Sequence, residues 1–101
     1  MTIYARLTDD GAVVCGQPSG SRTCGAELAR LVTGEDFWYI ERRREFSSHR
    51  NRRRLGEIFA DNATIDRVED VTCPRCSRQN VLEARKILDV WLARRRGDVL
   101  P

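Results

Sequence analysis

The first fifteen residues contain two short runs in which apolar and polar side chains alternate. The runs cover residues 3–7 and 12–15, and the sequence T-D-D-G between them contains an Asp-Gly pair. Such a pair between two alternating runs is typical of a tight β-turn. The pattern therefore predicts a β-hairpin that ends at Cys15.

Residues 26–42 contain a second pattern of the same kind. The runs 26–32 and 37–42 flank the turn sequence T-G-E-D, which suggests another hairpin. The apolar residues of the first run are also spaced as on one face of a helix. A short helix at 26–32 therefore stays open as an alternative to the strand.

The second half of the chain begins with a predicted helix and a predicted strand. Leu55, Ile58 and Phe59 are spaced i, i+3, i+4, which predicts a short helix from about residue 49 to residue 60. The sequence V-E-D-V-T at residues 68–72 has the composition of a strand.

A longer helical pattern covers residues 81–96. Asn80 is followed three residues later by Glu83, which fits a capped helix start, and Gly97 follows three arginines at the other end. The apolar stripe of this helix consists of Ala84, Ile87, Leu88, Trp91 and Leu92. We expect an amphipathic C-terminal helix.

The composition indicates one small domain, residues 1–101, with a thin core. The chain has 41% hydrophobic and 33% charged residues, and a domain of this size often needs a metal or disulfides to stabilise it. The chain shows neither a charged-then-apolar leader nor an apolar run of roughly 18 residues. We expect a cytoplasmic protein without a membrane segment, and in that reducing environment paired cysteines are more often metal ligands than disulfides.

The four cysteines fall into two turns. Cys15 and Cys24 are each followed by glycine, and Cys73 and Cys76 flank the dipeptide Pro74-Arg75. Glycine lets the chain turn so that backbone amides point at the sulfur, and proline stiffens the equivalent turn. Four thiolates in two such turns predict one tetrahedral structural Zn²⁺. The eight-residue spacer of the first pair is longer than the usual two to four.

The sequence allows three other roles for the cysteines. A pair of disulfides and four unconnected buried thiols both stay open. The sequence C-P-R-C also occurs in the redox turn of thioredoxin-like folds, where a strand precedes it and a βαβ unit follows. Here only one helical pattern follows the turn, so redox catalysis is not expected.

Two knuckles joined by short strands resemble a zinc ribbon. The residues C-G-A-E-L-A-R-L-V-T-G-E-D-F-W-Y-I-E, together with V-E-D-V-T-C-P-R-C-S-R-Q-N-V, are similar to the Com-type zinc-finger regulators of Mu-like phages. The resemblance covers residues 13–40 and 68–81. It implies a zinc ribbon with four cysteine ligands and a phage-encoded or phage-derived regulator that binds nucleic acid in the host cytoplasm. The family's first cysteines are two residues apart, and it lacks a segment like 41–67.

That inserted segment, 41–67, carries a dense cluster of arginines. Residues 42–54 contain seven arginines and a single acid, Glu45. Guanidinium groups bind phosphate oxygens bidentately, so the cluster predicts a surface for DNA or RNA. The candidate residues, with two arginines beside the second knuckle, are Arg42, Arg43, Arg44, Arg50, Arg52, Arg53, Arg54, Arg75 and Arg78. We expect a small α+β fold in which a zinc ribbon carries an Arg-rich helical insertion.

Two alternatives to nucleic-acid binding stay open. Seventeen of the 18 basic residues are arginine, a bias typical of a high-GC genome, and the net charge of +3 falls to about +1 when four thiolates bind Zn²⁺. The cluster could then be a solvated charged face. Alternatively the protein is a docking module for a larger complex such as polymerase or a phage assembly, through Ile87, Leu88, Trp91 and Leu92.

Catalysis is not expected. His49 and Asn51 resemble part of a His-Asn-His nuclease site, but the chain has one histidine and no nearby pair of acids to hold a catalytic cation. We find no Gly-rich phosphate loop and no Ser-His-Asp order. We predict a non-enzyme without a small-molecule substrate.

Overall fold

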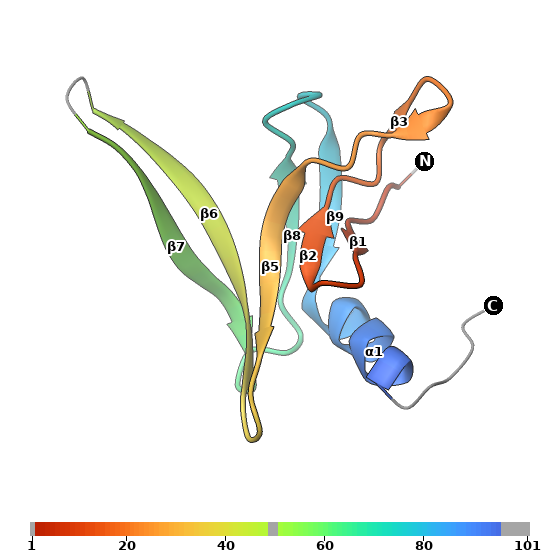
Figure 1. Ribbon diagram of the computed structural model, residues 1–101, viewed down its shortest axis with the longest axis vertical. Helices are drawn as coiled ribbons and strands as arrows, with labels where there is room; N and C mark the ends of the chain where they lie inside the picture. The colour runs from red at the N-terminus through yellow and green to blue at the C-terminus, as the bar shows by residue number, and fades with distance from the viewer. Residues whose placement is uncertain (1, 49–50, 96–101) are drawn as a thin grey trace.

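Antiparallel strands and one C-terminal helix form the described part of the chain (Figure 1). The computed structural model describes residues 2–48 and 51–95, and only the backbone of residues 43–48 and 51–55. The elements are β1 (Arg6–Leu7), β2 (Ala12–Val14), β3 (Pro18–Ser19), β4 (Arg22–Thr23), β5 (Glu27–Thr33), β6 (Trp38–Ser48), β7 (Asn51–Asp61), β8 (Val68–Thr72), β9 (Gln79–Glu83) and α1 (Ala84–Arg95).

The strands pair into one larger sheet and two small ones. The order of the larger sheet is β1-β2-β5-β6-β7, and β3-β4 and β8-β9 are separate hairpins. The predicted hairpins at β1–β2 and β5–β6 are confirmed, as is the strand at 68–72. Residues 26–32 contribute to a strand and not to a helix, because β5 pairs on both sides with neighbouring strands.

The helix predicted from residue 49 to residue 60 is wrong. Residues 51–61 form β7, which pairs with β6 along its whole length. Ile58 is 62% exposed, whereas Phe59 and Ala60 are both buried, and the register between β6 and β7 shifts at this point, as at a β-bulge. Gly56 in the middle of the segment also disfavours a helix. The spacing of the apolar residues is compatible with a helix and with a strand. The segment forms a strand because it pairs with β6.

The predicted start of the C-terminal helix is also wrong. Residues 79–83 form β9, which pairs with β8 so that Val71 lies opposite Asn80, and α1 begins at Ala84. Asn80 is therefore a buried strand residue and not a helix cap. The pairing of the two strands that flank the second knuckle overrides the local capping signal. The predicted helix does exist over residues 84–95, and residue 96 lies outside the described range.

The N-terminal segment and α1 connect the β8–β9 hairpin to the larger sheet. The amide of Ala5 donates to the carbonyl of Val81, and the amide of Val81 donates to Ile3, at 3.0 and 2.8 Å. Near the end of α1, the guanidinium of Arg94 donates to the carbonyl of Leu7 at 2.9 Å. The buried core includes Val13, Leu28, Ile40, Phe59, Val71, Leu82 and Ile87. These contacts hold residues 3–7 and α1 against one core.

The β6–β7 hairpin extends past the rest of the larger sheet. The last pair between β5 and β6 joins Ala29 and Arg42, whereas β6 and β7 remain paired as far as Ser48 and Asn51. Figure 1 shows the part of this hairpin beyond Arg42, residues 43–48 and 51–56, as a two-stranded arm that leaves the body of the protein. The arginine cluster therefore belongs mostly to an extended β-hairpin. In the described ranges, no helix is long and apolar enough to cross a membrane.

Two isoleucines test the strand register of the outer sheet. Ile40 is completely buried and Ile58 is 62% exposed. Ile40→Ala should lower the free energy of unfolding by about 2–5 kcal/mol, because it opens a cavity in the core. Ile58→Ala should change it by less than about 0.5 kcal/mol. Denaturant unfolding measures both, and equal losses would contradict the burial of Ile40 and the exposure of Ile58.

Candidate metal centre

The sulfur atoms of the four cysteines lie close together where the two knuckles meet. The Sγ atoms of Cys15 and Cys76 are 3.7 Å apart, those of Cys24 and Cys73 are 3.8 Å apart, and all four lie within 4.8 Å of one another. Zn–S bonds of about 2.3 Å in a tetrahedron place neighbouring sulfurs about 3.8 Å apart. Disulfide sulfurs would be about 2.05 Å apart, and all four thiols are free. The cluster could hold a metal ion, and the predicted ligand set is brought together.

A small hairpin explains the long spacer of the first knuckle. Strands β3 and β4 occupy residues 18–23, and the amide of Cys24 donates to the carbonyl of Gln17 at 2.8 Å, which closes the base of the hairpin. Without that hairpin, only Gly16 and Gln17 separate Cys15 from Cys24. The effective spacing is therefore the two residues usual for structural zinc sites.

The two knuckles have the same backbone pattern. In the first, the amide of Gly25 donates to the carbonyl of Cys15 at 3.0 Å; in the second, Ser77 donates to Cys73 at 2.9 Å. The first cysteine of each knuckle also donates its amide to the carbonyl two residues after the second cysteine, at 2.9 and 2.8 Å. Gly25 and Ser77 both have positive φ, 71° and 61°. The cluster is thus built from two copies of one turn.

Asn80 connects the second knuckle's hairpin to the first knuckle. Its side-chain amide donates to the Cys15 sulfur at 3.1 Å, and its oxygen accepts from the amide of Gly16 at 2.8 Å. The residue is 1% exposed. Gly16 is required here because a Cβ at this position would clash with the carbonyl oxygen of Tyr4. This role of Asn80 was not predicted from the sequence. The signal that could have indicated it is a polar residue placed between the second knuckle and the apolar residues that follow.

The charge state of the sulfurs depends on their neighbours. Burial raises the pKa of Cys73, but the amides of Cys76 and Arg75 and the nearby Cys76 and Cys15 side chains lower it by more, to about 7. The amide of Arg78 lowers the pKa of Cys76, but burial and the Cys15 and Cys73 side chains raise it by more. The raised pKa of Cys76 disfavours its thiolate when no cation is bound. A cation at the centre of the cluster would favour the thiolate form of all four cysteines.

The structure describes only some of the arginines predicted to bind nucleic acid. Arg42 forms an ion pair with Glu69 at 2.7 Å and has a side chain 17% exposed, so it is not a free phosphate ligand. Arg75 and Arg78 are exposed beside the second knuckle. The backbones of Arg43, Arg44, Arg52, Arg53 and Arg54 lie in the arm, whereas their side chains and all of Arg50 lie outside the described structure.

The helix stripe suggested for docking is partly covered. Ile87 and Leu88 are 4% and 7% exposed, and Trp91 packs partly buried against the core. Leu92 is 36% exposed. The four residues therefore do not form one open face in this structure.

The fold and the cluster define a small α+β protein with four cysteines placed where they could hold a metal ion. Comparisons with protein-family models, with curated proteins and with solved structures found no match to this chain.

The Asn80 side chain should matter more for metal affinity than an exposed neighbour. Asn80→Ala removes the donor to the Cys15 sulfur and leaves the Gly16 amide without its acceptor. Loss of such outer-shell partners typically weakens metal binding by about 10- to 100-fold. Competition with a chromophoric chelator measures the affinity. The control is Gln79→Ala, an exposed neighbour on the same strand, and equal losses in both variants would contradict the role given to Asn80.

The two equivalent turns predict opposite effects of exchanging glycine and serine. A non-glycine residue at positive φ is strained by about 1–2 kcal/mol, offset in part by the greater chain entropy of glycine. Ser77→Gly should therefore raise the free energy of unfolding by about 0.5–1 kcal/mol, and Gly25→Ser should lower it by about as much. A Cβ at Gly25 would lie 3.7 Å from its nearest neighbour, an ordinary van der Waals distance. A steric clash therefore does not contribute to the effect of Gly25→Ser. Changes of the same sign in denaturant unfolding would contradict the equivalence.

Proposed function

We propose that this protein is a zinc-stabilised, nucleic-acid-binding regulator without catalytic activity. The observation that supports zinc is the four-sulfur cluster, whose Cys15–Cys76 and Cys24–Cys73 separations match the edges of a Zn–S tetrahedron. Four thiolates satisfy the ion completely and leave no position for a reacting water. The ion would therefore hold the two knuckles together and perform no chemistry.

The nucleic-acid proposal is supported by the shape of the arginine-rich segment. Beyond Ala29 and Arg42, strands β6 and β7 continue as a ribbon of two strands. The major groove of B-DNA admits a two-stranded ribbon, whereas the major groove of A-form RNA is deep and narrow. We therefore favour duplex DNA as the target. The resemblance of the knuckle sequences to phage regulators agrees with this class of function.

Burial of the helix stripe makes docking the weaker proposal. A helix that binds in a partner's groove needs its apolar anchors exposed, but Ile87 and Leu88 are buried. Arg94, which a docking helix would offer to an acidic partner, donates instead to the carbonyls of Leu7 and Thr8 at 2.9 and 3.0 Å. Ile87, Leu88 and Arg94 thus contribute to the protein's own fold. The arm is therefore the better candidate for a binding surface.

Salt dependence tests the proposal. Each phosphate contact contributes about −0.9 to the slope of log K against log salt for duplex DNA. If Arg52, Arg53 and Arg54 each bind a phosphate, replacing the three by Gln should flatten the slope by about 2.7. Fluorescence anisotropy with a labelled duplex at several salt concentrations measures this slope.

The matched control replaces three exposed arginines outside the arm, Arg67, Arg85 and Arg95, by Gln. This variant carries the same change in net charge and should keep the original slope. Two results would reject the proposal: no salt-dependent binding of the unaltered protein to DNA or RNA at low ionic strength, or the same slope in both variants. Retention of one stoichiometric protein partner after nuclease treatment would favour docking instead.

A further inference from the structure

A pocket separate from the metal cluster lies between the N-terminal segment, the β3–β4 hairpin and α1. Its volume is about 840 Å³, within the range of small-ligand sites. Ile3, Leu7, Val81, Ile87 and Val90 contribute apolar lining, and Thr2, Ser21 and Thr23 contribute hydroxyl groups. A pocket lined in this mixed way suits a ligand that has both an apolar part and polar groups.

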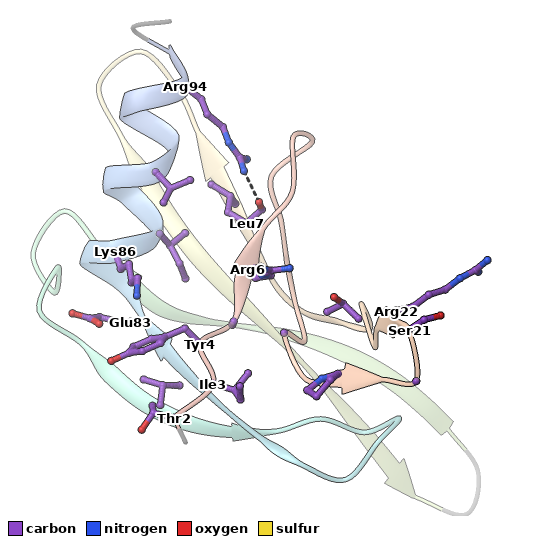
Figure 2. A pocket seen from close by; sticks show the side chains of 18 residues that line it. Thr2, Ile3, Tyr4, Arg6, Leu7, Ser21, Arg22, Glu83, Lys86 and Arg94 are labelled. Carbon is purple, nitrogen blue, oxygen red and sulfur yellow. Dashed lines mark hydrogen bonds between the residues drawn. The ribbon is translucent and has the colours of Figure 1, made fainter. Parts of the chain in front are cut away.

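The charged groups around the pocket are mostly cationic. Arg6, Arg22, Lys86 and Arg94 line it, and among the described residues Glu83 is the one carboxylate of the lining. Figure 2 shows Lys86 and Tyr4 at one end, Ser21 and Arg22 on the hairpin at the other, and Arg6 between them. Arg22 extends outward from the rim in this view. The pocket therefore favours an anionic ligand.

Arg94 and Arg6 have different roles in this pocket. Arg94 is held by the carbonyls of Leu7 and Thr8 and by Asp9. Arg6 and Arg22 form no ion pair with any residue in the described ranges, and Lys86 lies 3.6 Å from the centre of the Tyr4 ring. Unpaired guanidinium groups are well suited to phosphate oxygens. Arg94 is therefore held by the fold, whereas Arg6 has no ion-pair partner in the described ranges and is available to a ligand.

We propose that this pocket binds a nucleotide unit, with its phosphate at Arg6 and its base against Tyr4 and the apolar wall. In Figure 2 Lys86 lies beside Tyr4 at the base end of the pocket, and the hairpin residues Ser21 and Arg22 lie beyond Arg6, at the phosphate end. The site is distinct from the arm, which lies on the other side of the body in Figure 1, so the inference goes beyond duplex binding. It also revises the expectation from sequence that no small molecule binds here.

Isothermal titration with AMP, adenosine and inorganic phosphate tests the pocket, with the metal-loaded full chain as the sample. AMP should bind at least about tenfold more tightly than either fragment, because phosphate and base contribute together. Arg6→Gln should weaken AMP binding by about tenfold or more, the usual effect of losing a hydrogen bond to a charged group. Because Arg6 is exposed, the variant should keep its metal content and its circular dichroism spectrum.

Two further comparisons separate this site from the arm. The variant with Arg52, Arg53 and Arg54 replaced by Gln should bind AMP as the unaltered protein does, whereas Arg6→Gln should leave duplex DNA binding unchanged. A short single strand that binds more tightly than AMP, and loses its advantage in Arg6→Gln, would identify an unpaired nucleotide of a strand as the source. Absence of AMP binding at millimolar concentration, equal binding of adenosine and AMP, or an unaltered affinity in Arg6→Gln would overturn the proposal.

Discussion

The contact among four sulfur atoms joins two segments of the chain that are far apart in sequence. Cys15 meets Cys76, and Cys24 meets Cys73, across 61 and 49 residues. Each knuckle is a local turn, and the β8–β9 hairpin that delivers the second one forms no strand ladder with the larger sheet in the described structure. The position of that hairpin, and of the helix that follows it, therefore depends on how the knuckles meet.

The hydrogen bonds around the cluster transmit this dependence to the rest of the fold. Asn80 links β9 to the first knuckle, and the adjacent Val81 pairs with the N-terminal segment through Ile3 and Ala5. The same segment continues into β1, whose end accepts the hydrogen bonds of Arg94 from α1. A chain with few large buried side chains thus gains order from a polar centre. If the cluster holds a metal ion, its removal should destabilise the β3–β4 and β8–β9 hairpins and α1.

Much of this centre could be predicted from sequence, because knuckles are local. Cysteine, glycine and proline in short spacing specify the turns, so the sequence correctly predicted that the four cysteines form one cluster. The partners of the ligands depend on distant contacts. Asn80 satisfies a helix-cap pattern in the sequence, but β8 lies beside it and makes it a strand residue that reaches Cys15.

The arginine-rich segment was predicted wrongly for a related reason. Leu55, Ile58 and Phe59 fit a helical stripe over so short a length as well as they fit a strand. The strand forms because β7 pairs with the edge of β6 from Asn51 to Asp61, with one register shift near Ile40. The pattern of apolar residues in β7 does not show that β6 is available as a pairing partner. The pocket beside Arg6 could not be predicted either, because the residues that line it come from separate stretches of the chain.

X-ray absorption at the zinc edge, combined with chelation, tests the central role of the four sulfurs most directly. Protein purified under reducing conditions should contain one zinc per chain with four sulfur ligands at about 2.3 Å. Removing the ion should unfold the chain cooperatively, and adding it back should restore the fold, because metal binding supplies part of the folding free energy. A reduced, metal-free protein with an unchanged unfolding transition, or a bound ion with fewer than four sulfur ligands, would contradict this account.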